Sequence, residues 1–182
     1  AELRALSGDE RAPLVAELAA AQAMFGQLEI ALRTAELLEE DEERDRAQSR
    51  VAVALARAGN AEDARIVAEA IGDDDERDWA FDELTRLAAS TADWDEALAL
   101  AEQIVSAEQR ARTMADLALA QARAGYSARA HAFAQQIELP GERLRALMAI
   151  AEPLLSQGLL LRAEEQIAAL GNPDQRSRYQ GA

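Results

Sequence analysis

Hydrophobic positions return along the chain at a fixed spacing of 33 residues. One column holds only alanine, another only leucine or isoleucine, and an arginine column runs in register with both. A constant period of this length is typical of repeat proteins, in which each unit buries its apolar face against its neighbours. The three columns are Ala31, Ala64, Ala97, Ala130 and Ala163; Leu38, Ile71, Ile104, Ile137 and Leu170; and Arg11, Arg44, Arg77, Arg110, Arg143 and Arg176.

Within each unit the apolar spacing is that of a helix. Ala64, Ala68 and Ile71 stand at positions i, i+4 and i+7, which share one face of a helix and cannot share one face of a strand. A column of small residues divides each unit into two such stretches, because glycine reaches the left-handed conformation that ends a helix. This column consists of Gly26, Gly59, Ala92, Gly125 and Gly158. The pattern predicts an all-α fold of about five stacked helix hairpins.

The period also predicts how the chain is organised. We expect a single helical-repeat domain over residues 1–182, with units at approximately 10–42, 43–75, 76–108, 109–141 and 142–174. Residues 1–9 are interpreted as the tail of a preceding helix and 175–182 as the start of a sixth unit, so the array is expected to be truncated at both ends. Pro13 is expected in a first turn, where proline is harmless, whereas Pro153 is expected to kink or break its helix.

The segment Ala92-Asp93-Trp94-Asp95-Glu96-Ala97 resembles the turn and second-helix start of tetratricopeptide repeats. Looser versions begin at Gly59 and Gly125, and the similarity covers residues 10–173. The period of 33 differs from the usual period of about 34 residues in that family. Ankyrin repeats share the shorter period, but their Thr-Pro-Leu-His turn does not occur here.

The resemblance implies a right-handed α-solenoid that acts as a non-catalytic scaffold, with a peptide or protein partner bound on the concave face. It also implies that the chain is part of a larger bacterial protein. The alternatives are a self-association or structural module with exposed apolar ends, and the sensor domain of a multidomain signalling ATPase or transcriptional regulator. A helical-repeat enzyme or regulatory lid is the least favoured class.

Composition and charge narrow the choice of partners. The 182-residue chain is 49% hydrophobic but only 4% aromatic, and alanine has the highest helix propensity. The net charge of −15 argues against nucleic acid and anionic membranes as partners, since both require a basic face. No apolar run is long enough for a membrane span, no signal segment occurs and there is no cysteine, so a cytoplasmic location is expected.

In the geometry that the resemblance implies, the first helix of each unit lines the groove. Trp79 among several arginines has the composition of a binding hot spot, and arginine binds carboxylates through two parallel hydrogen bonds. An acidic or C-terminal carboxylate peptide is therefore the predicted ligand. The alternative is a solvated face with Glu–Arg pairs and Trp79 packed between units. The predicted groove residues are Arg46, Arg50, Arg57, Trp79, Asp82, Arg86, Arg112, Asp116, Arg123 and Arg145.

The arginine and alanine columns receive a structural interpretation, because features common to every unit usually maintain the stack. A cation in the first turn of a helix is disfavoured by the helix dipole, so each arginine requires a local partner. Glu36, Glu69 and Glu102 stand eight residues before successive arginines of the column. We hypothesise that these Glu–Arg pairs set the angle between units.

Catalytic, metal and cofactor sites are not expected. His131 is the only histidine and is interpreted as a packed or surface side chain, so histidine-based metal sites and triads cannot form. The run Asp73-Asp74-Asp75-Glu76 lacks the alternating ligands and central glycine of a calcium loop and is interpreted as an acidic helix N-terminus.

Overall fold

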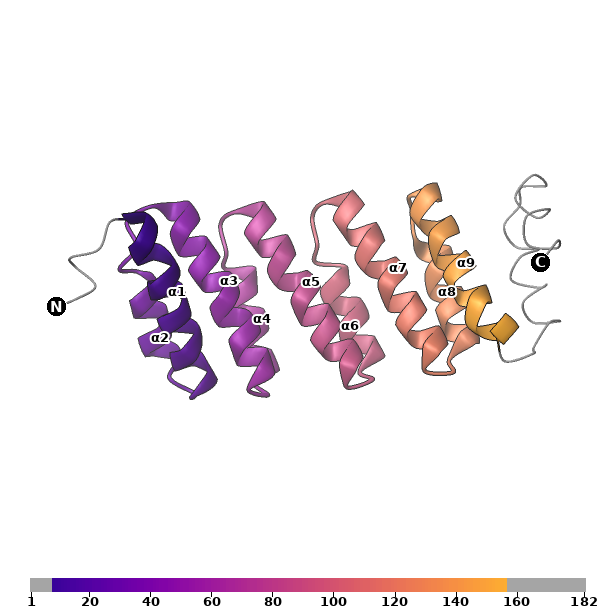
Figure 1. Cartoon of the computed structure of the whole chain (residues 1–182), viewed down its shortest axis with the longest axis horizontal. Coiled ribbons are helices and arrows are strands. Elements are labelled where there is room, and N and C mark those ends of the chain that lie inside the picture. Colours follow the sequence, from indigo (N-terminus) through magenta and orange to yellow (C-terminus); the bar gives the residue numbers. More distant parts are fainter. Residues whose placement is uncertain (1–7, 157–182) are drawn as a thin grey trace. The chain divides into compact units, whose positions relative to one another are not determined.

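The computed structural model describes residues 8–156, and over that range it contains nine helices and no strands. Consecutive helices form antiparallel pairs joined by tight turns (Figure 1). The all-α hairpin fold predicted from the sequence is therefore confirmed. The helices are α1 (Gly8–Met24), α2 (Leu28–Ala35), α3 (Asp41–Arg57), α4 (Ala61–Glu69), α5 (Asp74–Ser90), α6 (Trp94–Ala101), α7 (Ala107–Arg123), α8 (Ser127–Gln136) and α9 (Pro140–Ser156).

The helices keep the 33-residue register of the sequence. Each odd-numbered helix has 17 residues. Each begins two residues before the predicted unit boundary, because the residue that caps it lies further upstream than the arginine column suggests. Asp73 accepts a hydrogen bond from the Glu76 amide (2.9 Å), and Ser106 accepts one from the Gln109 amide (3.3 Å). These are N-caps, which satisfy amides that have no partner within the helix.

The turn that ends α1, α3, α5 and α7 has one backbone geometry throughout. Gly26, Gly59 and Gly125 have φ angles of 75°, 87° and 91°, and Ala92 has 61°. In the first of these turns, the Gly26 and Gln27 amides donate to carbonyls in the last turn of α1 at 2.9 and 3.0 Å. The same two bonds recur in the other three turns. This is the Schellman geometry, which satisfies the last carbonyls of a helix, as the glycine column predicts.

The alanine column is buried inside the first four hairpins. Ala31, Ala64, Ala97 and Ala130 are fully buried at the start of the even-numbered helices. Leu38, Ile71, Ile104 and Ile137 are buried where those helices give way to the next hairpin. A column of larger side chains, which includes Val51, Leu84, Leu117 and Ile150, is buried on the odd-numbered helices. Both helices of each hairpin thus contribute to the core that the apolar columns predict.

The arginine column binds the turns between hairpins through backbone carbonyls. Arg44 donates from Nη2 to the carbonyls of Leu38 (3.0 Å) and Glu39 (3.2 Å), and Arg77 donates to the carbonyl of Ile71 (3.2 Å). Each guanidinium therefore bridges the start of its own helix and the end of the preceding hairpin.

The hypothesis that Glu36 and Glu69 pair with Arg44 and Arg77 is wrong. Glu69 pairs instead with Arg65 on its own helix (3.2 Å), and Arg44 pairs with Asp41 (2.7 Å). The physical reason is distance along the chain: a carboxylate three or four residues away on the same helix lies within reach, so the guanidinium needs no carboxylate from the preceding helix.

Two aspartates fix the same turns from the other side. Asp45 accepts a hydrogen bond from the Asp73 amide at 2.7 Å, and Asp78, one repeat later, accepts one from the Val105 amide at 2.7 Å. A Cβ added to Gly72 would approach the Asp45 carboxylate to 3.2 Å, so this turn packs closely on α3. Backbone amides that would otherwise lack a partner are satisfied there by carboxylates.

The chain divides into two compact units, residues 1–105 and 106–182. In the first, α1 packs on α2 and α3, and α3 packs on α4 and α5. In the second, α7 packs on both α8 and α9. Each unit has its own buried core, and each is described separately below.

The helices bear on both expectations about proline. α9 continues through Pro153 to Ser156, so the helix does not break there, and a kink at Pro153 stays a prediction. Pro13 lies inside α1 and not in its first turn, because α1 already begins at Gly8. The predictions for residues 1–7, for Gly158, Ala163, Leu170 and Arg176, and for the second helix of the fifth hairpin concern residues outside the described range. Within that range no helix has the length and apolar character needed to cross a membrane.

Candidate functional site

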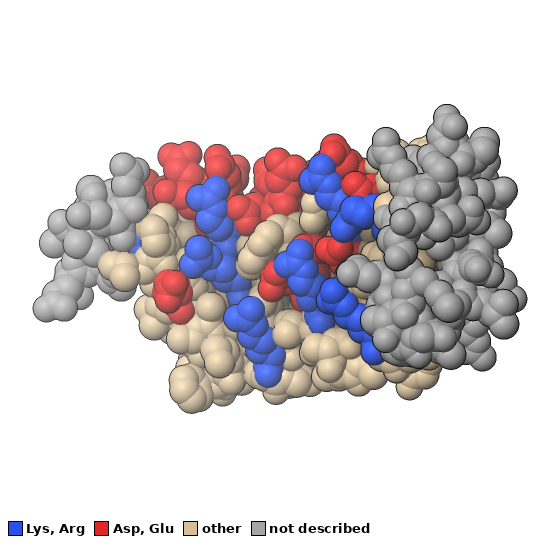
Figure 2. Space-filling model, turned by 45° about the vertical axis from the view of Figure 1, so that its right-hand side comes forward, with Lys and Arg blue, Asp and Glu red and all other residues tan. Residues whose placement is uncertain are grey.

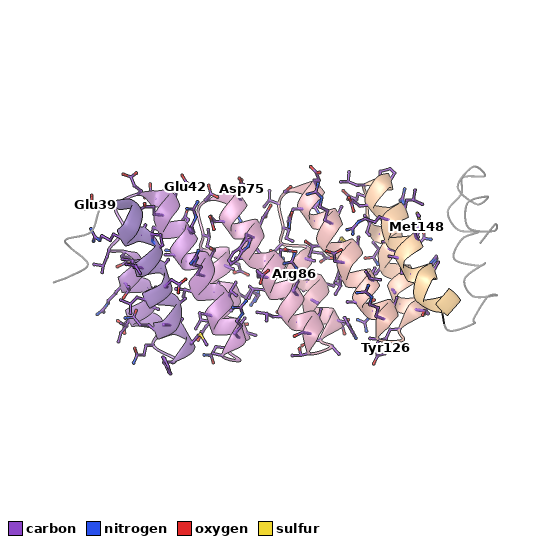
Figure 3. The ribbon with its side chains drawn as sticks, in the orientation of Figure 1. Glu39, Glu42, Asp75, Arg86, Tyr126 and Met148 are labelled. Atoms are coloured by element: carbon purple, nitrogen blue, oxygen red, sulfur yellow. The ribbon has the colours of Figure 1, made fainter. Side chains whose placement is uncertain are left out.

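In the first unit, five of the predicted groove residues form an exposed surface on α3 and α5. We call this surface the arginine face and define it by Arg46, Arg50, Arg57, Trp79 and Arg86. Basic side chains cross the face of the odd-numbered helices, and acidic side chains gather at the end where those helices begin (Figure 2). Glu39, Glu42 and Asp75 lie at that acidic end, whereas Arg86 lies away from it, in the second half of α5 (Figure 3).

Arg46 links two neighbouring hairpins through Glu76. Its Nε atom lies 2.9 Å from Glu76 Oε1, and its Nη2 atom lies 3.1 Å from Glu42 Oε1. The other oxygen of Glu76 accepts a hydrogen bond from the Ser49 hydroxyl at 3.0 Å. The hydrogen bond to Glu76 raises the pKa of Arg46 above its ordinary value. Arg46 is therefore a permanently charged side chain that is already held in place.

Glu83 connects the arginines of the face that lie toward the C-terminal ends of α3 and α5. Arg86 binds Glu83 (2.7 Å) and Asp82 (2.6 Å), and Arg57 on α3 lies 3.7 Å from Glu83. Asp82 was predicted as a groove residue, but only 4% of its surface is exposed. It supports Arg86 and does not offer a free carboxylate to a partner.

Trp79 is the aromatic residue of the arginine face. At this position the second, fourth and fifth hairpins carry Arg46, Arg112 and Arg145, and the first carries Pro13. Its relative exposure is 42%, so a large apolar surface remains open to solvent. By contrast, Trp94 on α6 is buried. Trp79 is therefore partly packed and partly open to solvent, and the alternative of a solvated face with Glu–Arg pairs stays open beside the groove interpretation.

In the second unit, Arg145 on α9 contacts α7. It lies 3.2 Å from Asp116 and 2.6 Å from Glu142, and it donates to the Arg112 carbonyl at 3.4 Å. The hydrogen bond to Glu142 is the main cause that raises the pKa of Arg145. Arg123 is exposed at the end of α7. Four predicted residues thus lie on one pair of neighbouring helices, and three of them are in contact.

The arginines are neutralised by their neighbours. In the first unit four arginines of the face bind five carboxylates. The reason is that many of these pairs follow the i, i+3 and i, i+4 spacing of a helix. The carboxylates are Glu17, which lies 3.4 Å from Arg50, and Glu42, Glu76, Asp82 and Glu83.

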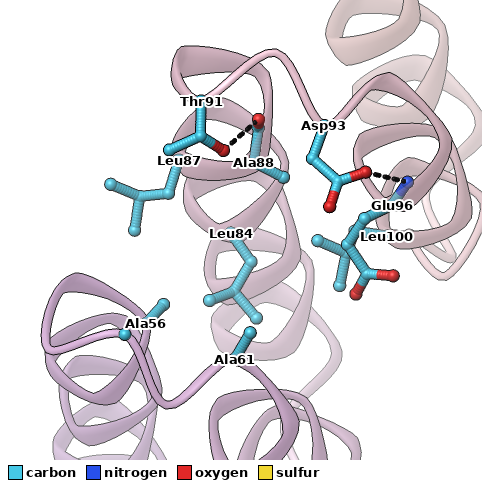
Figure 4. A pocket seen from close by; sticks show the side chains of 10 residues that line it. Ala56, Ala61, Leu84, Leu87, Ala88, Thr91, Asp93, Glu96 and Leu100 are labelled. Atoms are coloured by element: carbon cyan, nitrogen blue, oxygen red, sulfur yellow. Dashed lines mark hydrogen bonds between the residues drawn. The ribbon is translucent and has the colours of Figure 1, made fainter.

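A cavity lies at the opposite, turn end of the first unit and was not predicted. It is an apolar cavity of about 210 Å³ between the α3–α4 hairpin and the α5–α6 hairpin (Figure 4). Leu84, Leu87 and Leu100 form its inner wall, and Ala56 and Ala61 form the facing wall. Ala88, Thr91, Asp93 and Glu96 complete its lining, with Gly59 at the turn.

The sequence carries a signal for this cavity. Ala61 and Ala88 stand where the previous repeat has Leu28 and Leu55. Both of those leucines pack in the core of the first unit. Two large-to-small exchanges at one interface leave a void, because the surrounding helices relax only partly.

The described residues contain no group of three or more side chains that could hold a metal ion. The acidic run before α5 is used locally: Asp73 caps the helix, and Asp74 pairs with Arg77. His131 lies 3.1 Å from the Gln135 amide on α8.

Comparison with known proteins gives one structural likeness. A solved structure from Podosopora anserina, described as nearly identical TPR-like repeats of a kinesin light chain, is 20% identical and has a TM-score of 0.45. The match covers 97% of this chain and 100% of the other. No protein-family model matches the chain, and no curated protein matches it. The assignment of stacked helix hairpins therefore rests on the helices, turns and packing described above.

Proposed function

We propose that the chain is a non-catalytic protein-interaction module whose partner docks on the arginine face. The observation that carries this proposal is the exposure of Trp79 among charged side chains that are already ordered. Tryptophan and arginine are the residues most enriched at interface hot spots, and an ordered face loses little conformational entropy on binding. The absence of cysteine and the single histidine in the sequence agree with a non-catalytic role.

The partner is a peptide or protein segment that places an apolar group on Trp79 and a carboxylate beside it. Arg46 lies at the equivalent position one hairpin earlier, and about half of its side chain is exposed. Exposed ion pairs contribute only about 0–1 kcal/mol each, so a ligand carboxylate can replace Glu42 at Arg46 at small cost. Carboxylates already occupy the face, so the apolar contact supplies most of the affinity.

Calorimetric titration with a capped acidic peptide that contains one aromatic residue tests this proposal. We expect Trp79→Ala to weaken binding about thirtyfold, the loss typical of a hot-spot residue, and Arg46→Ala to weaken it less. Arg33→Ala is the matched control, because Arg33 forms an exposed pair with Glu29 on α2, outside the arginine face. Binding that survives both Trp79→Ala and Arg46→Ala would exclude the arginine face as the site.

A second candidate function is self-association through α1. Leu14 and Leu18 are 50% and 42% exposed, whereas the equivalent Ala47 and Val51 on α3 are completely buried under the first hairpin. α1 therefore presents the apolar stripe that each later hairpin buries. A hairpin from another copy of the chain could cover this stripe. A role as the sensor domain of a larger bacterial regulator is compatible with binding through the arginine face or through α1.

A further inference from the structure

The cavity at the turn end of the first unit reaches the core. Leu84 and Leu100 belong to the main hydrophobic cluster of the unit, and Ala56 and Ala88 pack against that cluster. The remaining lining is exposed or half-buried, so the cavity opens to solvent between the two hairpin turns. A side chain that enters from outside would contact core leucines directly.

The rim of the cavity is acidic. Asp93 and Glu96 line it, and Asp95 follows in the same turn of α6. Asp93 accepts a hydrogen bond from the Glu96 amide at 3.3 Å as the helix cap. The charge of Glu96 also acts on Arg65 of α4, but Arg65 is held mainly by Glu62 at 3.0 Å and by Glu69 at 3.2 Å. The carboxylates of Asp93 and Glu96 outweigh the roughly half positive charge of the α6 N-terminus. The rim therefore attracts a cation.

We propose that this cavity is a second binding site, which takes one apolar side chain of a partner protein segment that carries arginine or lysine next to it. The site is separate from the arginine face and does not depend on it. The apolar side chain replaces the leucines that Ala61 and Ala88 omit, and the cationic side chain pairs with Glu96 at the rim.

Size and charge select this class of ligand. The volume of about 210 Å³ lies below the range of roughly 300–1,000 Å³ typical of small-molecule sites, so the cavity suits one side chain better than a cofactor. Acidic and basic-apolar segments are thereby assigned to different surfaces of the same unit: the former to the arginine face, the latter to the turn end.

The test is a titration followed by NMR on the methyl groups of Ala61, Leu84 and Leu100. The probe is a capped pentapeptide with leucine at its centre between two arginines. We expect shifts confined to these methyl groups at millimolar peptide. The same peptide with serine in place of leucine, or glutamate in place of both arginines, should produce none of them.

Variants of the cavity provide the decisive comparison. Ala61→Leu restores the leucine of the first repeat and should abolish the shifts while the fold is retained, and Ala88→Leu should do the same by filling the opposite wall. Ala99→Leu adds the same atoms on an exposed face of α6 and should leave binding unchanged.

The charge on the rim is tested separately. Glu96→Gln should weaken binding about two- to fivefold, the range for one exposed ion pair, and Glu36→Gln, at the exposed residue that follows α2, is the charge-matched control. The proposal is overturned if the filled variants bind the leucine peptide as well as the wild-type protein, or if the serine peptide shifts the same methyl groups. None of these variants changes the arginine face. The titration with the acidic peptide therefore tests the proposed function independently of the cavity.

Discussion

Ala92 holds a backbone conformation that glycine holds at every other described position of its column. A left-handed conformation costs an L-residue roughly 1–2 kcal/mol, and part of this is offset because alanine restricts the unfolded chain more than glycine does. No atom lies within 4 Å of a Cβ built at Gly26, Gly59 or Gly125, so the preference for glycine there is conformational and not steric.

We expect Ala92→Gly to raise the free energy of unfolding by about 0.5–1 kcal/mol. Gly125→Ala should lower it by a similar amount, because it introduces the same strain into an equally open turn. Urea denaturation followed by circular dichroism measures both. Equal midpoints for Ala92→Gly and wild type would show that the turn at Ala92 is not strained.

Gln121 is a second residue that is held in the fold at a cost. It is completely buried, and neither atom of its amide has a hydrogen-bond partner. The equivalent Gln22 accepts a hydrogen bond from the Thr34 hydroxyl at 2.8 Å, whereas Phe133 replaces that threonine in the fourth repeat. The fourth repeat has therefore kept the glutamine side chain but lost the hydroxyl group that donates to it.

Gln121→Leu, which copies Leu55 of the second repeat, should stabilise the protein by about 1–3 kcal/mol, since burying an unpaired polar group costs that much. Gln22→Leu is the control and should be neutral or destabilising, because it leaves Thr34 without its acceptor. Thermal unfolding compares the two variants, and a lower melting temperature for Gln121→Leu would contradict the interpretation.

At the scale of helices and turns, close packing depends on the alanine column. Ala97 is completely buried, so Ala97→Leu should overpack the third hairpin and cost about 1–3 kcal/mol in the free energy of unfolding. Ala99→Leu on the exposed side of the same helix should change it by less than about 0.5 kcal/mol. Denaturant unfolding of the pair measures the difference, and a neutral Ala97→Leu would argue against tight packing between α5 and α6.

The arginine column makes a parallel prediction for the turns between hairpins. Arg44→Ala removes two hydrogen bonds to carbonyls and should cost about 1–2 kcal/mol in stability, since hydrogen bonds to charged groups contribute about 1.5–3 kcal/mol and this side chain is partly exposed. Arg44→Lys should recover only part of this lost stability, because lysine lacks the planar guanidinium group that donates several parallel hydrogen bonds. Arg33→Ala should be nearly neutral. If all three variants unfold alike, the carbonyl contacts do not stabilise the turn.

The 33-residue columns predicted the hairpins, the turns at Gly26, Gly59, Ala92 and Gly125, and the buried alanines, because each depends on local spacing and backbone preference. The helix starts were predicted two residues late, although Ser106 and Gln109 form a recognisable capping pair. The prediction of Glu–Arg pairs across the turns was wrong, because the arginines bind backbone carbonyls. Every residue has a backbone carbonyl, so the sequence does not show which one accepts.

For the candidate site, the sequence predicted which residues are exposed better than it predicted which charged side chains pair with each other. Trp79 lies on the surface as the groove interpretation requires, but Asp82 is buried beneath Arg86. The cavity was missed because it arises from two alanines, Ala61 and Ala88, that are unremarkable alone and lie 27 residues apart in the sequence. Only comparison of repeats with one another exposes it.

At the scale of the whole molecule, the proposed self-association makes a prediction about the exposed stripe on α1. Complete burial of a leucine side chain yields about 1.5–3 kcal/mol, and Leu14 and Leu18 are already about half buried, so the rest of the α1 face must supply part of the energy of a weak dimer. We expect light scattering to show a mass that rises with concentration, and the double variant Leu14→Gln, Leu18→Gln to remain monomeric. Identical masses for both proteins at every concentration would exclude α1 as the contact.

The identical spacing of the helix starts affects how the number of repeats can change during evolution. If residues 41–73 were deleted, Arg77 would follow Leu38 at the distance in sequence that now separates Arg44 from it, and α5 would take the place of α3. Unequal recombination between neighbouring repeats of the gene can therefore shorten or lengthen the array by whole hairpins. Each product would keep the register of helices and turns while bringing together hairpins that are not neighbours now, so the number of hairpins can change without a change in their spacing.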